Sequence, residues 1–335
     1  LPVTFTVATG AIYRYTSGPF APTNVVIVGV FETNTTSPLT LSGNLTVQNN
    51  GILRQNYDGT NAPTVSNLKL TAVNIDVQAG GKIDVTGRGY LNGPGVGGNS
   101  GESGGNYGGM GGASWGGVNS GRPYGSSTQP VDPGSGGTGS IDGNRGGGVM
   151  KLVVSGTLTV NGSILSKGGN YNHGGSGGSI WLDVGTLAGA GTIDASGGSG
   201  VNQYSGGGGG GRIAVYYTTK TFTGAIQSLP GTGAYNAGAP GTIYLKVAGS
   251  NGDLTVDANN IGSTGWTELG SGGSPYTLDT LTTNRGAVLK GLTGTTITPT
   301  AIAGDGTGTF EQAGATVNLP VTFTVATGAI YRYTS

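Results

Sequence analysis

The chain has 335 residues, of which 73 are glycine and only 9% are charged, against about 7% glycine and 25% charged residues in ordinary globular domains. Its 15 basic and 15 acidic side chains cancel, which argues against nucleic acid or an anionic membrane as a partner. The chain has no cysteine and only one histidine, so we expect no disulfide and no His- or Cys-based metal site. No apolar run approaches the roughly 18 residues of a membrane-spanning helix, so we expect no membrane insertion.

Residues 1–91 predict short strands joined by tight turns. The segment 5–14 (FTVATGAIYR) aligns with the segment 45–54 (LTVQNNGILR), and each predicts a strand, a turn and a second strand. Apolar and polar residues alternate within these segments, which places one face of a strand inward and the other outward. We therefore expect coils of a β-solenoid over 1–91.

Residues 92–148 form a glycine-rich insert, with glycine at 23 of 57 positions. Shorter relatives lie at 168–178 and 197–211, between predicted strands. Three arrangements remain open for these segments: a flexible linker, irregular ordered loops, or polyglycine II helices packed side by side, an approach that only glycine permits. A phosphate-binding loop is disfavoured because no helix is predicted after any of them.

Residues 149–318 repeat one pattern at a nearly constant interval. Four apolar strands start at almost even spacing, and another apolar strand residue follows each start by 13 or 14 positions. The starts are Met150, Ile180, Ile213 and Ile243, and the following residues are Ile164, Ile193, Ile226 and Val256. A fixed period favours a solenoid over a sandwich or barrel, because each coil buries its apolar residues against the next. The predicted fold is all-β, a β-solenoid (parallel β-helix) with glycine-rich inserts.

Residues 319–335 are identical to residues 1–17. We interpret this as a unit, 1–318, that recurs in tandem, so that 319–335 start the next repeat and the chain is part of a longer protein. The alternatives are a deliberate overlap introduced at the two ends of the chain, and a terminal duplication that lets neighbouring subunits exchange strands. An uncapped solenoid exposes unpaired backbone groups, so both copies are expected to be assembly surfaces. The candidate assembly residues are Val3, Phe5, Val7 and Ile12, and Val321, Phe323, Val325 and Ile330.

Aromatic residues inside the glycine-rich segments are the candidate surface contacts. They are Trp115, Tyr171 and Tyr204. Aromatic rings offer an apolar face that stacks on sugars or on neighbouring fibres.

No catalytic residue is predicted. Carboxylates such as Asp183 and Asp194 are dispersed over separate strands, whereas enzymes that cleave polysaccharides need close sets of acidic groups. Oxygen-rich turns such as 305–306 leave calcium as a weak option, and no other cofactor is expected. His173 has no acidic neighbour in sequence and is interpreted as a histidine of a surface loop.

The segments 177–198 (GGSIWLDVGTLAGAGTIDASGG), 205–217 (SGGGGGGRIAVYY) and 238–247 (GAPGTIYLKV) resemble the glycine-rich β-helical repeats of giant secreted bacterial surface and filament proteins. The inserts are also similar in texture to the polyglycine bundles of some phage tail-tip adhesins. The resemblance covers about 150–256 well and implies export, a surface location and a fibrous or adhesive role. It carries over no catalytic residue.

The sequence thus predicts a structural repeat unit of an extracellular, prokaryotic cell-surface fibre, assembled head to tail by strand stacking. Its expected partners are copies of itself, also side by side, and surface glycans. The alternative is a repeat module of an adhesin that acts as a stalk or binds glycans. A β-helix enzyme that degrades polysaccharides is less favoured.

Overall fold

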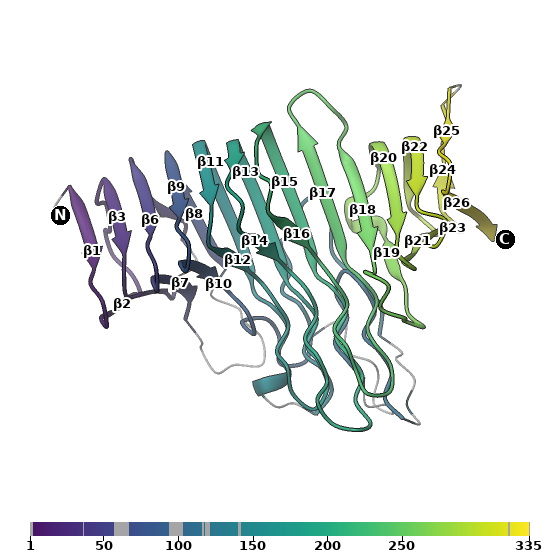
Figure 1. Cartoon of the computed structure of the whole chain (residues 1–335), viewed down its shortest axis with the longest axis horizontal. Coiled ribbons are helices and arrows are strands. Elements are labelled where there is room, and N and C mark those ends of the chain that lie inside the picture. The colour runs from purple at the N-terminus through teal and green to yellow at the C-terminus, as the bar shows by residue number, and fades with distance from the viewer. Residues whose placement is uncertain are drawn as a thin grey trace.

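The computed structural model describes residues 3–35, 37–56, 67–93, 103–115, 117, 121–139, 142–320 and 322–334. Over these residues the regular structure is almost entirely β, with 3-10 turns at η1 (Asp142–Asn144) and η2 (Ser271–Gly273). Figure 1 shows the strands side by side in one long row, with the two termini at opposite ends. Within the described residues, none of the helical segments is long and apolar enough to cross a bilayer. The all-β solenoid prediction is confirmed.

The first half of the row consists of two parallel sheets that pack on one core. The large sheet contains, in this half, β1 (Thr4–Val7), β3 (Asn24–Ile27), β5 (Leu39–Thr40), β6 (Asn44–Val47), β8 (Leu68–Ala72), β9 (Asn74–Val77), β11 (Val149–Val160), β13 (Ser179–Ala188), β15 (Arg212–Lys220) and β17 (Thr242–Val247). The second sheet contains β2 (Ile12–Tyr15), β4 (Val30–Thr33), β7 (Ile52–Gln55), β10 (Lys82–Asp84), β12 (Ser163–Leu165), β14 (Thr192–Asp194) and β16 (Ala225–Gln227). Each coil therefore adds one rung to both sheets.

The spacing in the sequence sets the register of these rungs. The four predicted strand starts are direct neighbours in the large sheet, and three of the four following residues are direct neighbours in the second sheet. These rows run Met150, Ile180, Ile213, Ile243, and Ile164, Ile193, Ile226. Their inward side chains stack rung on rung, so burial is shared between nearest neighbours.

An asparagine ladder reinforces the early coils. The Nδ2 of Asn44 donates to Oδ1 of Asn24 at 3.3 Å, and the Nδ2 of Asn74 donates to Oδ1 of Asn44 at 2.9 Å. Each side chain pairs with the rung before it, so the polar outer edge repeats as regularly as the apolar core.

Among the described strands, the direction of the large sheet reverses once, between β17 and β18 (Asp253–Asp257). These two strands are antiparallel, with Tyr244 opposite Leu254, whereas the strands on either side of the pair are parallel to their own neighbours. The prediction that Val256 continues the row of Ile226 is wrong. The short segment 248–252 forms a hairpin turn and cannot carry the chain around another coil.

The second half continues the large sheet and adds a third sheet. In the large sheet β18 is followed by β20 (Tyr276–Asn284), β22 (Thr296–Gly304), β24 (Thr316–Val317) and β25 (Thr324–Val325). The third sheet contains β19 (Thr267–Leu269), β21 (Val288–Leu292), β23 (Thr309–Ala313) and β26 (Ile330–Thr334). The strands paired within this half run parallel to one another.

The two halves bury opposite faces of the large sheet. On β15, Ile213 and Val215 belong to the first core while Ala214, which lies between them, belongs to the second. On β17, Tyr244 belongs to the second core and Ile243 packs against the first. Successive residues of a strand point to opposite faces, so the first core lies on one face of the large sheet and the second core on the other. The change from one face to the other occurs at the strands where the direction reverses.

Three long connections leave the row together on one side, as Figure 1 shows. We call them the glycine arms: 166–178 between β12 and β13, 195–211 between β14 and β15, and 228–241 between β16 and β17. Most of their glycines are buried. The described part of the predicted insert 92–148 packs among them, as in the hydrogen bond from Gly209 N to Gly105 O at 2.9 Å.

Backbone hydrogen bonds in the arms repeat with a period of three. The donors and acceptors are Gly207 to Asn236, Gly208 to Gly198, Gly209 to Gly105, Gly210 to Ala239 and Gly211 to Ala195, at 2.8 or 2.9 Å. Successive N–H groups thus point in rotation to three neighbouring segments, which is the period of a polyglycine II helix. A Cβ on Gly208 would collide with the carbonyl oxygen of Gly175. The flexible-linker interpretation is therefore wrong for these segments.

Arg212 connects the insert to both halves of the row. Its fully buried side chain donates from Nε to the Tyr124 carbonyl at 2.9 Å and from Nη1 to Ser127 Oγ at 2.5 Å. Its Nη2 donates to the Glu268 carbonyl at 3.3 Å. One side chain therefore joins the start of β15, the insert and the first strand of the third sheet.

Candidate assembly surfaces

The two identical segments form the same kind of coil at opposite ends of the row. In the first copy, β1 lies in the large sheet and β2 in the second sheet; in the second copy, β25 lies in the large sheet and β26 in the third. The turns match: Ala11 N donates to Ala8 O and Ala329 N to Ala326 O, both at 3.0 Å. Gly10 and Gly328 hold φ of 75° and 85° in these turns, a left-handed conformation that glycine adopts without strain.

The two copies stack on opposite neighbours. The first copy pairs with the rung that follows it, through β3 and β4. The second copy pairs with the rung that precedes it, through β22 and β23. Val7 is consequently 2% exposed, whereas its equivalent, Val325, is 49% exposed. Ile12 is 62% exposed, whereas its equivalent, Ile330, is partly buried.

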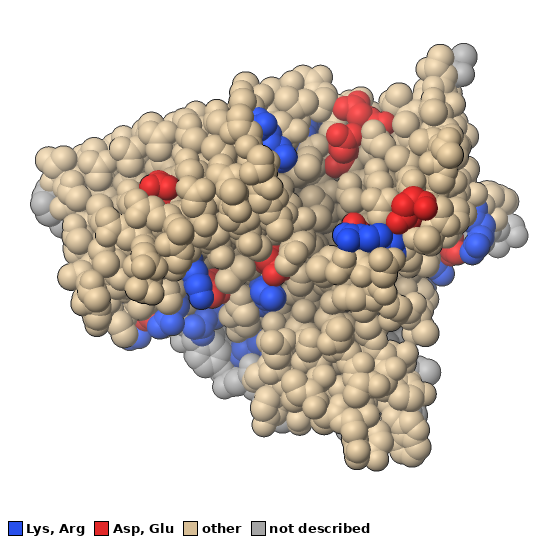
Figure 2. All heavy atoms as spheres, in the orientation of Figure 1, with Lys and Arg blue, Asp and Glu red and all other residues tan. Residues whose placement is uncertain are grey.

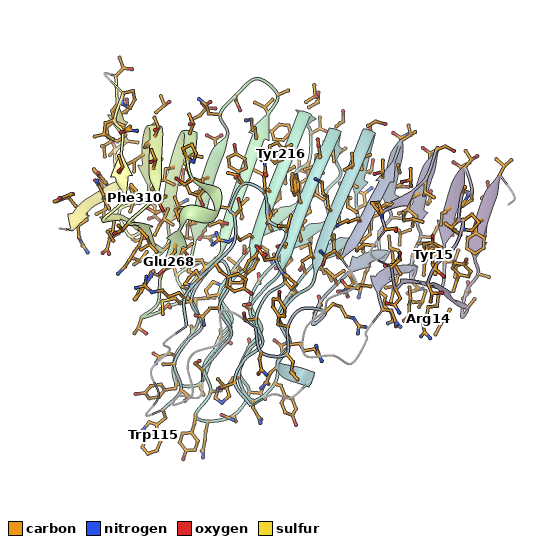
Figure 3. The ribbon with its side chains drawn as sticks, turned by 180° about the vertical axis from the view of Figure 1, so that it is seen from behind. Arg14, Tyr15, Trp115, Tyr216, Glu268 and Phe310 are labelled. Carbon is orange, nitrogen blue, oxygen red and sulfur yellow. The ribbon has the colours of Figure 1, made fainter. Side chains whose placement is uncertain are left out.

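The two copies of the repeated phenylalanine, Phe5 and Phe323, do not differ in this way. Val3 is exposed at the edge of the large sheet, and Phe5 and Phe323 are partly buried against the first and second cores. Val321 lies outside the described residues. Within one chain the two groups are not brought together, because Arg14 and Tyr15 lie toward one end of the row and Phe310, beside the second copy, lies at the other (Figure 3).

Charged side chains alternate along the outer face of the second sheet. Glu32 accepts from Arg14 Nε at 2.9 Å and from Arg54 Nε at 2.8 Å, and the next position in register is Asp84. The Glu32 side chain is only 5% exposed. Burial raises the pKa of Glu32, but the hydrogen bonds and charges of the two arginines outweigh it and leave that pKa below its ordinary value.

The third sheet carries the same alternation. Lys290 Nζ and Arg332 Nη1 lie 3.4 Å and 2.8 Å from the carboxylate of Glu311. The residue in register before Lys290 is Glu268. Figure 2 shows that charged side chains on the face drawn gather in small groups of both signs, and that most of this surface is uncharged.

Aromatic residues accompany both copies on the inner face. The Tyr331 ring stacks on Phe310 with centroids 5.4 Å apart. In the first copy the equivalent Tyr13 lies 5.2 Å from Phe31. The repeated tyrosine thus has a phenylalanine partner on the preceding rung in one copy and on the following rung in the other.

The predicted surface contacts gather at the tips of the glycine arms. Trp115, which is 67% exposed, contacts the Tyr204 ring at 5.5 Å between centroids. Tyr171 is also exposed and bridges to Gly200 in the next arm. Tyr235, in the turn of the third arm, is a further exposed aromatic residue. Figure 3 shows Trp115 at the end of the arms, far from the row of strands.

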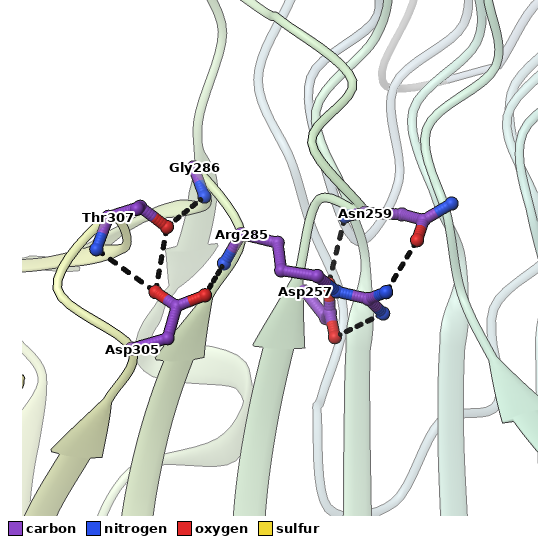
Figure 4. Close-up of polar contacts among 6 residues, drawn as sticks. All are labelled: Asp257, Asn259, Arg285, Gly286, Asp305 and Thr307. Carbon is purple, nitrogen blue, oxygen red and sulfur yellow. Dashed lines mark hydrogen bonds and ion pairs between the residues drawn. The ribbon is translucent and has the colours of Figure 1, made fainter.

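A polar cluster surrounds the turns of the second half (Figure 4). Arg285 Nε and Nη2 donate to the two carboxylate oxygens of Asp257 at 2.7 Å, and Nη1 donates to Asn259 Oδ1 at 2.6 Å. Asp305 accepts from Thr307 and from the Arg285 backbone N–H, and these bonds hold its pKa well below the ordinary value. The carboxylate oxygens of Asp257 and Asp305 therefore accept hydrogen bonds of the kind found in ordinary turns.

One pocket of about 360 Å³ lies where the first core ends. It is lined by β16, the edge strand of the second sheet, and by Ile243 and Thr255 of the large sheet. It lies at this point because β18 belongs to the opposite core.

The acidic residues considered for catalysis lie on separate surfaces. Asp183 is exposed in β13 of the large sheet, whereas Asp194 is buried in β14 of the second sheet. Asp194 accepts from Ser196 N at 2.8 Å and from Gln227 Nε2 at 3.0 Å. The part of the chain that the structure describes contains no group of three or more His, Cys, Asp or Glu side chains placed to hold a metal ion.

His173 is not a surface residue. It is 4% exposed, and its Nδ1 accepts from the Gly206 N–H of the neighbouring arm at 3.3 Å. The surface prediction is wrong because the arms pack on one another and cover the loop, which the local sequence does not show.

Comparison with protein-family models, with curated proteins and with solved structures finds no match.

Proposed function

We propose that this chain is a repeat unit of an extracellular, prokaryotic cell-surface fibre whose units join head to tail through continuous β-sheets. The supporting observation is that one repeated sequence forms a coil at both ends of the row, paired with the following rung in one copy and the preceding rung in the other. Residues 319–335 are, in this proposal, the first coil of the next unit.

The apolar contacts support this junction. If β25 and β26 take the place of β1 and β2, the repeated valine gains Ile302 on one side and Ile27 on the other. The repeated tyrosine gains Phe310 on one side and Phe31 on the other. Val325 and Ile12, each largely exposed in its own copy, are then covered, which stabilises the junction by the hydrophobic effect.

The charged residues support it independently. Because Arg332 and Arg14 are equivalent, the alternating charges of the third sheet and those of the second sheet meet at that arginine. They then form one row of alternating sign. In order the row is Glu268, Lys290, Glu311, Arg332 (equivalent to Arg14), Glu32, Arg54 and Asp84. Opposite charges on adjacent strands stabilise a pairing, and like charges oppose it. A junction shifted by one rung would place like charges together.

A doubled chain, in which residues 18–335 follow Ser335 a second time, tests the proposal. Each unit adds eleven strand-to-strand steps from β1 to β25, which at about 4.8 Å per step give about 53 Å. Electron microscopy is expected to show one straight rod that is longer than the single chain by this rise. Two rods joined at variable angles would contradict the proposal. The matched control is Tyr331→Pro, which removes an N–H from the junction strand.

Glycan binding is the second candidate, favoured by the exposed aromatic residues at the arm tips. Binding on a glycan array is expected to fall at least tenfold in Trp115→Ala and in Tyr204→Ala. Tyr333→Ala changes a tyrosine at the end of the row that is more exposed than either arm residue and is the control. Unchanged binding in the arm variants, or equal loss in the control, would count against an adhesive role for the arms.

A further inference from the structure

The two halves of the row are related by a half-turn about its long axis. Strands of the large sheet run in one direction up to β17 and in the opposite direction from β18 onward. The core lies on one face of this sheet in the first half and on the other face in the second. A half-turn about the row axis reverses both the strand direction and the face, so one operation accounts for both changes.

The sense of winding agrees with this relation. In the first half a strand of the large sheet leads through a tight turn into the second sheet, as β6 leads into β7. In the second half β22 leads in the same way into β23 of the third sheet. A rotation preserves handedness, whereas a mirror relation, which L-residues disfavour, would not.

The half-turn is carried into the next unit. β25 is parallel to β22 and therefore runs in the direction of the second half. Phe323 and Tyr331 pack against the second core as Phe5 and Tyr13 pack against the first. If 319–335 are the first coil of the next unit, that unit begins with its strands opposite to those of the unit before.

We infer that successive units of the fibre are related by a two-fold screw, so that the glycine arms project alternately from opposite sides. This inference rests on the proposed head-to-tail function and specifies the interface between copies of the chain. The axial rise is about 53 Å per unit, and arms on the same side recur at about 106 Å.

The arms mark the orientation of each unit because they belong to one half only. All three leave from connections between the second sheet and the large sheet in the first half. The corresponding connections of the second half, 270–275, 293–295 and 314–315, are short. The two sides of the fibre are therefore equally supplied with arm tips, in a staggered arrangement, and one fibre can present its exposed aromatic residues to neighbours on both sides.

The absence of cysteine from the sequence permits a direct test. Val201, in the turn of the second arm, is 67% exposed, so Val201→Cys gives each unit one site for a maleimide–gold label. A chain of three units, made by repeating residues 18–335, is labelled and imaged by electron microscopy. The unsubstituted chain, treated identically, is the control for nonspecific gold.

Three outcomes are distinguishable. A straight rod with gold on alternating sides, one label per unit rise along the axis and one per two rises on each side, supports the screw. A straight rod with all gold on one side, one label per unit rise, overturns the screw but leaves the fibre intact. Separate or flexibly joined particles overturn the proposed function and, with it, the screw.

Discussion

The two halves of the row differ in the connections between their strands and in how their smaller sheets end. The first half has long glycine arms and a second sheet whose last strand, β16, ends beside a pocket. The second half has short connections, and its third sheet ends on the repeated coil. One continuous sheet serves both cores, because a single hairpin between β17 and β18 lets each face be buried in turn.

Loss of the Arg212 side chain, which joins the two halves, is expected to reduce stability more than any other change considered below. Arg212→Ala leaves buried partners such as the Tyr124 and Glu268 carbonyls without their donor, and it opens a cavity at the boundary. We expect a loss of about 3–5 kcal/mol in unfolding free energy, measured by urea denaturation. Hydrogen exchange is expected to rise most in the second half. A change no larger than that of Lys246→Ala, at a partly exposed position of β17, would show that the halves are held together by other contacts.

The glycine arms differ from the strands in depending on the absence of side chains. Gly208→Ala places a methyl group against the Gly175 carbonyl, and we expect a cost of about 1–3 kcal/mol in urea denaturation. Gly262→Ala is the matched control, because the space around its Cβ is open. Equal stability of the two variants would contradict tight packing of the arms.

A smaller effect is expected at Glu32, which sets the charge alternation in the first coils. Glu32→Gln is expected to lower stability by about 1–2 kcal/mol near neutral pH, measured by thermal unfolding. Asp183→Asn, an exposed change of equal charge in β13, is the control.

Glu32 also makes the stability of the chain depend on pH. The pKa of Glu32 is lowered in the folded chain, so its stabilising contribution is complete above the pKa of the unfolded state. That contribution is lost as the pH falls through the folded value, which lies below 4.5. The stability measured by thermal unfolding between pH 7 and pH 3 should therefore fall less steeply in Glu32→Gln than in the parent. Parallel plots of stability against pH for the variant and the parent would show that the charge of Glu32 does not contribute to stability.

The coils could be predicted because residues that stack in neighbouring coils of a solenoid recur at a regular interval in the sequence. Met150, Ile180, Ile213 and Ile243 are neighbours in the sheet, as their intervals require. The reversal could not be predicted in the same way, because the Leu-Thr-Val at 254–256 looks like the Leu-Thr-Val at 45–47. The signal that distinguishes it is the segment AGSNG at 248–252, with positive φ at Gly249 and Gly252, which suits a hairpin.

The candidate assembly surface was only partly visible in the sequence. The identity of 1–17 and 319–335 indicates which segments to compare, but the alternating charges depend on which strands are neighbours. Arg14, Glu32 and Arg54 lie 18 and 22 positions apart, and these unequal intervals give no periodic signal. The burial of His173 likewise depends on packing between arms, which is set by backbone hydrogen bonds rather than by side-chain pattern.

The junction between two units can be seen directly in a cryo-electron microscopy map of the doubled chain at a resolution that separates strands. We expect the junction strand, with the sequence of β25, to pair with β22 on one side and with the second unit's copy of β3 on the other, in one unbroken sheet, as the head-to-tail proposal requires. A junction strand paired on one side only, with the second unit folded apart, would contradict it.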